Sequence, residues 1–193
     1  MIRKLVFIAS LLLAMDSLAT TTTDAHEWLR RMSMASHSLN YSGTFVYQHE
    51  GRLESMQVLH AMDDQGERER LISLTGSRRE VLRDNSEVTC VLGDSQSVLV
   101  NKSSPRVSYP ASFPTEVDKI DNYYRFEVLG DDRVAGLDCK VVVVRPRDDF
   151  RYGRRLCVHA DSHLLLRSEL TDMQGKVIEQ FMFTEVRFPA EIS

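Results

Sequence analysis

Three cysteines, at positions 90, 139 and 157, are the first side chains in this sequence whose spacing could support chemistry. Cys139 and Cys157 fall on the two arms of an expected hairpin, and pairing Pro146 with Phe150 at its turn would place them directly opposite each other. Directly opposed residues of a non-hydrogen-bonded pair come within disulfide range. We therefore expect a Cys139–Cys157 disulfide if the protein is exported, with Cys90 as a buried thiol. The alternative is that all three thiols are buried and reduced.

Catalytic and metal-binding patterns are weak in this sequence. A catalytic cysteine would need a histidine nearby, but the six histidines are scattered along the chain. His159 and His163 flank a turn with no carboxylate or cysteine at ligand spacing, so we expect no metal site. The sequence contains no nucleophile elbow, phosphate loop or dinucleotide fingerprint. These patterns predict neither an enzyme nor a cofactor.

Two groups of arginines could bind an anionic ligand. Arg78 and Arg79 follow a Gly-Ser turn. The second group crowds one hairpin tip and comprises Arg145, Arg147, Arg151, Arg154 and Arg155. Guanidinium groups can fork onto phosphates or carboxylates, but charged side chains also protect sheet edges from aggregation. Asp148 and Asp149 favour the second interpretation for the hairpin tip, whereas both interpretations stay open for Arg78 and Arg79.

Six apolar residues could line a ligand cavity, because a curved sheet with helices on its concave side can enclose one. They are Phe45, Tyr47, Met56, Val58, Phe181 and Phe183. The methionine would adapt to varied apolar ligands. The other interpretation is that these side chains fill an ordinary core.

The elements that must position these residues are mostly strands. A helix with Asp24 as its N-cap would place Trp28, Leu29 and Met32 on one apolar face. Alternating apolar and polar residues predict strands over residues 41–49, 53–62, 67–74, 79–83, 88–92, 98–100, 125–134, 139–145, 152–159, 164–170 and 177–186. A long loop is expected over residues 101–114 and a short helix over residues 115–123. Short turns between strands indicate antiparallel pairing. The expected fold class is therefore α+β, a large curved antiparallel sheet with a few helices covering its concave face.

The first nineteen residues indicate export. Arg3 and Lys4 precede an apolar run of about ten residues, which is too short to span a bilayer, and Ser17-Leu18-Ala19 places small residues at a cleavage site. The formal net charge of the whole chain is −4, which argues against nucleic acid as a partner. We expect a cleavable signal peptide over residues 1–19 and a periplasmic protein.

Four motifs, in matching order, resemble the RseB/MucB family of periplasmic regulators of the envelope-stress sigma factor. They are SLNYSGTFVY at 38–47, GSRREV at 76–81, DNYYRF at 121–126 and GKVIEQF at 175–181. The resemblance implies an unclosed antiparallel half-barrel, related in fold to the lipoprotein carriers LolA and LolB. It implies this domain over residues 24–188, followed over 189–193 by the start of a linker to a C-terminal domain.

The resemblance also implies a function. The protein would bind the periplasmic segment of a RseA/MucA-like membrane anti-sigma factor and restrain its proteolysis, and lipopolysaccharide or lipoprotein acyl chains would relieve that binding. It gives Arg78 and Arg79 a role near lipid phosphates and favours the ligand cavity over the filled core. Self-association stays open. The alternative function is a periplasmic carrier of lipoprotein or lipid.

Overall fold

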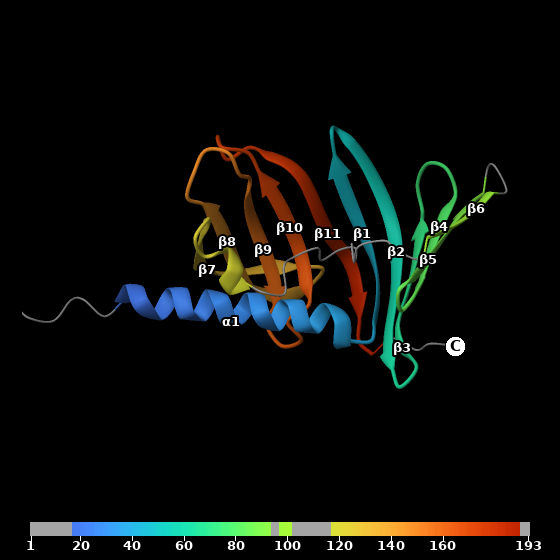
Figure 1. The fold of residues 1–193 in the computed structure, drawn as a ribbon, viewed down its shortest axis with the longest axis horizontal. Coiled ribbons are helices and arrows are strands. Elements are labelled where there is room, and N and C mark those ends of the chain that lie inside the picture. Colours follow the sequence, from blue (N-terminus) through green and yellow to red (C-terminus); the bar gives the residue numbers. More distant parts are fainter. Residues whose placement is uncertain (1–16, 94–96, 102–116, 190–193) are drawn as a thin grey trace, which may run out of the picture.

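The computed structural model describes residues 17–93, 97–101 and 117–189, which form one large antiparallel sheet with a long helix on one side (Figure 1). The helix α1 spans Ser17–Ser38, and a short 3-10 helix, η1, spans Val117–Ile120. The strands are β1 (Tyr41–His49), β2 (Arg52–Asp63), β3 (Gly66–Ser73), β4 (Arg79–Asp84), β5 (Glu87–Leu92), β6 (Ser97–Asn101), β7 (Tyr124–Val134), β8 (Leu137–Pro146), β9 (Gly153–His159), β10 (Leu165–Thr171) and β11 (Val177–Arg187).

The sheet is open. Its eleven strands are hydrogen-bonded in the order β6-β5-β4-β3-β2-β1-β11-β10-β9-β8-β7, so β6 and β7 form its two edges. Every connection between paired neighbours is antiparallel, and the sheet is strongly curved (Figure 1). The α+β class and the unclosed antiparallel sheet are therefore confirmed.

The helix covers one part of this sheet. In α1, Ala25, Leu29 and Met32 are fully buried and belong to a cluster with Phe126 and Val142 from β7 and β8. The expected apolar stripe of the helix is thus confirmed. The N-cap prediction was wrong, because α1 begins at Ser17 and Asp24 lies within it. Residues 17–23 contain neither glycine nor proline, so nothing in the chain ends the helix there.

The second helix is shorter than expected, since η1 covers only four residues. The expected helix start at Thr115 lies outside the described residues, as does the expected loop except for Asn101, the last residue of β6. Most of the expected signal peptide is also outside them. The signal peptide and the domain bounds over 24–188 and 189–193 therefore stay predictions.

The Cys139–Cys157 disulfide is present, with the two Cα atoms 5.5 Å apart, but the expected register of its hairpin was wrong. Cys139 is opposite His159 and Cys157 is opposite Val141, so the bridge joins diagonal neighbours. The expected three-residue turn does not form. Instead the turn closes on the Asp148 carboxylate, which accepts a hydrogen bond from the Phe150 N–H.

Candidate functional site

The six apolar residues proposed as a cavity lining lie together on one face of the sheet. Phe45 is the direct cross-strand partner of Met56 on β2 and of Phe183 on β11, and Tyr47 is the partner of Phe181. The Phe45 and Phe181 rings are 4.9 Å apart, and the Phe181 and Phe183 rings are 5.1 Å apart. We call Phe45, Tyr47, Met56, Val58, Phe181 and Phe183 the aromatic core. All of its members except Tyr47 are buried.

A glycine makes this packing possible. A Cβ atom on Gly43 would lie 2.8 Å from the Phe183 ring and 2.4 Å from the Glu185 carbonyl oxygen. The ring therefore packs directly over the backbone of β1. The side chains of the aromatic core pack against one another and fill the space on this face of the sheet. Their role as the lining of a cavity for an apolar ligand stays a prediction.

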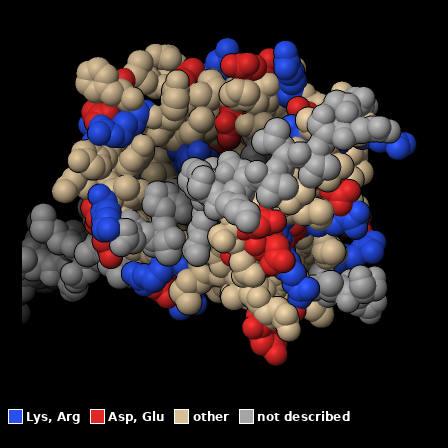
Figure 2. Space-filling view, turned by 45° about the vertical axis from the view of Figure 1, so that its right-hand side comes forward, with Lys and Arg blue, Asp and Glu red and all other residues tan. Residues whose placement is uncertain are grey.

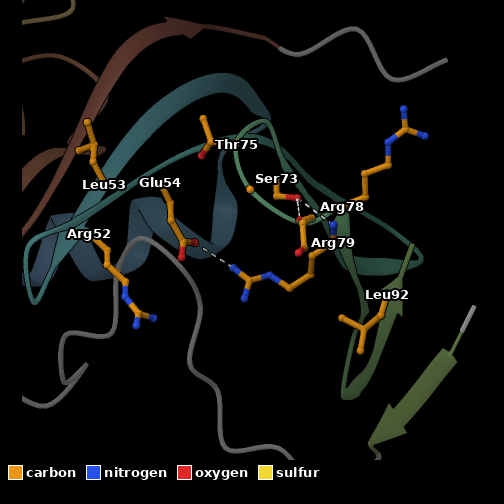
Figure 3. Close-up of a pocket in the computed structure, with 10 residues that line it drawn as sticks. Arg52, Leu53, Glu54, Ser73, Thr75, Arg78, Arg79 and Leu92 are labelled. Atoms are coloured by element: carbon orange, nitrogen blue, oxygen red, sulfur yellow. Dashed lines mark hydrogen bonds and ion pairs between the residues drawn. The ribbon is translucent and has the colours of Figure 1, made fainter. Parts of the chain in front are cut away.

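A groove of about 540 Å³ lies at the rim of the sheet, where β2 begins and β5 ends (Figure 3). It is lined by Arg52, Leu53, Glu54, Ser73, Thr75, Gly76, Ser77, Arg78, Arg79 and Leu92. We call this the rim groove. It contains both arginines that the sequence indicated as anion ligands.

The two arginines of the rim groove differ. The Nη2 atom of Arg79 donates to Oε2 of Glu54 at 3.2 Å, whereas the guanidinium of Arg78 points away from that pair (Figure 3). Glu54 is the cross-strand partner of Tyr47, so the Arg79–Glu54 pair lies on the face of the aromatic core. The rim groove is therefore the polar end of that face.

Hydrogen bonds to the backbone hold the turn between β3 and β4, which carries these arginines, in one conformation. The Arg79 N–H donates to Oγ of Ser73 at 2.8 Å, and that hydroxyl donates to the Ser77 carbonyl at 3.0 Å. The Gly93 N–H donates to the Arg78 carbonyl at 2.9 Å. Both guanidinium groups thus project from an ordered turn, which reduces the entropy lost when they bind a ligand.

Exposed leucines form the apolar part of the rim groove. Leu53 is 65% exposed and Leu92 is 36% exposed. These leucines lie beside two exposed guanidinium groups, those of Arg78 and Arg79. This combination suits an amphipathic anion, because its acyl chain would cover the leucines and its phosphate would bind the arginines. Sequence reasoning missed Leu53, Glu54 and Leu92. Their convergence depends on strand register, and the sequence signal was limited to their proximity to turns.

The arginines of the β8–β9 tip are engaged within the protein. Nε of Arg147 donates to the carbonyl oxygens of Asp121 and Tyr124, each at 3.0 Å. Arg151 pairs with Asp148 and lies 4.3 Å from the centre of the Tyr123 ring. Their geometry supports the structural interpretation of this group. Across the face that Figure 2 turns forward, positive and negative side chains are interspersed.

One group among the described residues has the spacing of metal ligands. His26, Asp118 and Asp121 place one ligand atom each within 4.8 Å of one another. Nε2 of His26 and Oδ1 of Asp121 are 2.6 Å apart, and Asp118 is exposed. In this structure the His26–Asp121 contact links α1 to the segment after η1.

An open antiparallel sheet, one long helix and the rim groove are the features to compare with known proteins. The sequence model of the MucB/RseB N-terminal domain matches residues 24–193. The sigma factor AlgU regulatory protein MucB of Pseudomonas aeruginosa is 34% identical over 189 residues, which cover 92% of this chain and 56% of that protein. The sigma-E factor regulatory protein RseB of Escherichia coli is 30% identical over 184 residues, which cover 95% and 57%. The chain belongs to the MucB/RseB family.

Solved structures agree with this assignment. A crystal structure of MucB superimposes with a TM-score of 0.74 at 30% identity, covering 89% of this chain and 61% of that one. A MucA/MucB complex from Pseudomonas aeruginosa gives a TM-score of 0.73 at 31% identity, covering 85% and 56%. The chain thus spans little more than half the length of these relatives. None of the helices in the described residues is long and apolar enough to cross a membrane.

Proposed function

We propose that this chain is the ligand-sensing domain of an exported regulator that binds the periplasmic segment of a membrane anti-sigma factor and restrains its proteolysis. The observation that carries this proposal is the similarity to MucB solved in complex with MucA(peri), which has a TM-score of 0.70 at 30% identity. The names of the relatives, regulatory proteins of the sigma factors AlgU and sigma-E, support the same role. Binding, without catalysis, is the activity proposed.

The periplasm is the proposed compartment. The Cys139–Cys157 disulfide supports it, because disulfides form and persist in oxidising compartments. A periplasmic protein can act on a sigma factor only through a protein that crosses the membrane. This supports a membrane anti-sigma factor as the direct partner.

The rim groove is the proposed lipid site. Lipopolysaccharide and lipoproteins combine acyl chains with polar or anionic groups, and the groove combines exposed Leu53 and Leu92 with Arg78 and Arg79. Acyl chains would extend from the groove along the aromatic core after displacement of side chains near Tyr47, which is only partly buried. Lipid binding would then change the affinity for the anti-sigma segment by linkage.

Pull-down with the periplasmic segment of the host's own anti-sigma factor tests the partner. We expect capture of that segment by the complete protein expressed from its gene. Lipid binding without any capture of the segment would contradict the regulator and favour the alternative, a periplasmic carrier of lipoprotein or lipid.

Charge reversal tests the lipid site. We expect Arg78→Glu with Arg79→Glu to weaken binding of lipopolysaccharide by about tenfold or more, since charge-assisted hydrogen bonds to phosphate are lost. Arg70→Glu is the matched control, because Arg70 lies on the neighbouring β3 and pairs with Glu80 outside the groove. Equal binding by all three proteins would remove the rim groove as the lipid site.

A further inference from the structure

A row of four ionisable side chains crosses strands β1 to β4 near the C-terminal end of α1. Tyr41 is the cross-strand partner of His60, His60 of Glu69, and Glu69 of Arg83, so the four lie in line on one face. Their exposed fractions are only 1%, 1%, 5% and 9%. We call them the polar row. Burial of such groups is costly unless they bind one another, so their protonation must matter to the local structure.

The contacts of His60 require an additional proton. Its Nδ1 lies 2.7 Å from the carbonyl oxygen of Leu39, and its Nε2 lies 3.2 Å from Oε1 of Glu67. A carbonyl oxygen and a carboxylate both accept, and a neutral imidazole has a single N–H. Both hydrogen bonds exist together only when His60 is an imidazolium or Glu67 carries a proton.

Glu67 is the group that stays ionised. Burial would raise its pKa, but hydrogen bonds from His37 and His60 outweigh burial and lower that pKa below its usual value. Nδ1 of His37 in α1 lies 3.1 Å from the same Oε1 atom. With Glu67 as a carboxylate, the additional proton belongs on His60. The two contacts of His60, to the Leu39 carbonyl just after α1 and to Glu67, therefore depend together on this additional proton.

A second proton is held by the polar row itself. Burial raises the pKa of Glu69 to about 7, with the Glu67 charge adding to the effect and Arg83 opposing it. Burial also raises the pKa of Tyr41, which keeps that hydroxyl neutral. As the pH rises through about 7, Glu69 loses this proton. An ionised Glu69 is a buried charge, and a neutral His60 keeps only one of its two hydrogen bonds.

We propose that the polar row, with Glu67 and His37, is a pH-sensitive latch that fastens the C-terminal end of α1 to β2 and β3 and loosens at alkaline pH. The groups that face it are His37 from α1, Tyr41 from β1, His60 from β2, Glu67 and Glu69 from β3, and Arg83 from β4. Ala25, Leu29 and Met32, which do not titrate, bury the middle of α1 against the sheet, and the His26–Asp121 contact of the helix lies away from the polar row. Loosening is therefore confined to the end of the helix.

Amide hydrogen exchange at pH 6 and pH 8.5, corrected for intrinsic rates, tests the latch. We expect residues 33–41 to open about tenfold more often at pH 8.5, while residues 25–32 keep their protection. Glu69→Gln keeps the side-chain shape without an ionisable carboxyl and should reduce this change. His49→Gln is the control, because His49 is half exposed at the far end of β1 and should behave as the wild type.

A second readout needs no substitution. Nitrogen NMR of the wild-type imidazoles should find protons on both ring nitrogens of His60 at pH 6. A single-proton His60 at pH 6 would overturn the proposal, as would opening of residues 33–41 that is equal at the two pH values. An undiminished pH response in Glu69→Gln would exclude Glu69 from the latch and contradict the role given to the polar row.

Discussion

The part of the sheet beneath α1 and the part that carries the rim groove are stabilised in different ways. On β8, Val141, Val142, Val143 and Val144 are all buried, because apolar residues pack against both faces of the strand. On β4, by contrast, Arg83 is the buried residue, and the described strand β5 has no buried residue. We call β7–β10 with α1 the covered half and β2–β5 the outer wing (Figure 1).

This difference indicates a division of roles. The covered half has apolar packing on two faces and a disulfide, so it should resist unfolding. The outer wing holds the rim groove, whose side chains are largely exposed, and His60, Glu69 and Arg83 of the polar row, which place ionisable groups in its interior. Regions that bind and respond to ligands are usually drawn from the less stable parts of a fold.

The largest effect is expected for truncation of the apolar contact between α1 and the sheet. Leu29→Ala removes a fully buried side chain and leaves a cavity, so we expect a loss of about 2–5 kcal/mol in the free energy of unfolding. Leu82→Ala on the outer wing, where the side chain is 39% exposed, is the comparison and should cost about 1 kcal/mol or less. Urea denaturation measures both. Equal losses would contradict the contrast between the two regions.

Loss of the disulfide should come next. Its 18-residue separation corresponds to about 3 kcal/mol in the chain-entropy model, so Cys139→Ser with Cys157→Ser should lower the free energy of unfolding by up to that amount. Cys90→Ser on β5 should change it little, because Cys90 is a free thiol of intermediate exposure, so its expected burial was wrong. Thermal denaturation with and without reductant checks the pair. If the reductant lowered the melting temperature of the double variant as much as that of the wild type, the disulfide would not be the cause of the reductant effect.

The pH dependence of stability should follow Glu69. Because burial raises its folded-state pKa from 4.5 to about 7, the folded state binds an extra proton between these values. This stabilisation is full below pH 4.5 and is lost as the pH rises through 7, to a total on the order of 3 kcal/mol. Glu69→Gln should flatten the curve measured by urea denaturation between pH 5 and 8. Arg70→Gln, on the same strand but exposed, should leave it unchanged.

The smallest effect is expected in the rim groove. Glu54→Gln removes the counter-charge of Arg79 and should change stability by less than about 1 kcal/mol, since both partners are more than 40% exposed. It should nevertheless strengthen lipopolysaccharide binding, because the guanidinium is released for phosphate. Calorimetric titration measures the affinity. Weaker binding in this variant would mean that the ion pair itself positions the ligand.

Much of the fold could be predicted because alternation determines strands locally. The expected strand over 53–62 differs from β2 by one residue at each end. Register could not be predicted, because it depends on turn geometry that composition leaves open. The turn after β8 closes on Asp148, and this moved Cys139 opposite His159. Arg78 and Arg79 of the rim groove could be singled out from their position at a turn, but its leucines could not.

The polar row shows what the same alternation could have revealed. His60 is in phase along β2 with Met56 and Val58, and Glu69 is in phase with Leu71. Residues in phase on a strand share a face, so these polar groups had to be buried with the apolar ones. The histidines are scattered along the sequence, and their shared burial is not evident from spacing alone. Their contacts link strands and helix ends that are distant in sequence.

Competition calorimetry on the complete protein expressed from its gene tests whether lipid bound in the rim groove weakens binding of the anti-sigma segment. The periplasmic anti-sigma segment is titrated into the wild type and into the Arg78→Glu, Arg79→Glu double variant, each with and without lipopolysaccharide. We expect both proteins to bind the segment, and we expect lipopolysaccharide to weaken this binding at least tenfold in the wild type alone. Absence of segment binding by the wild type, or equal competition in both proteins, would contradict it.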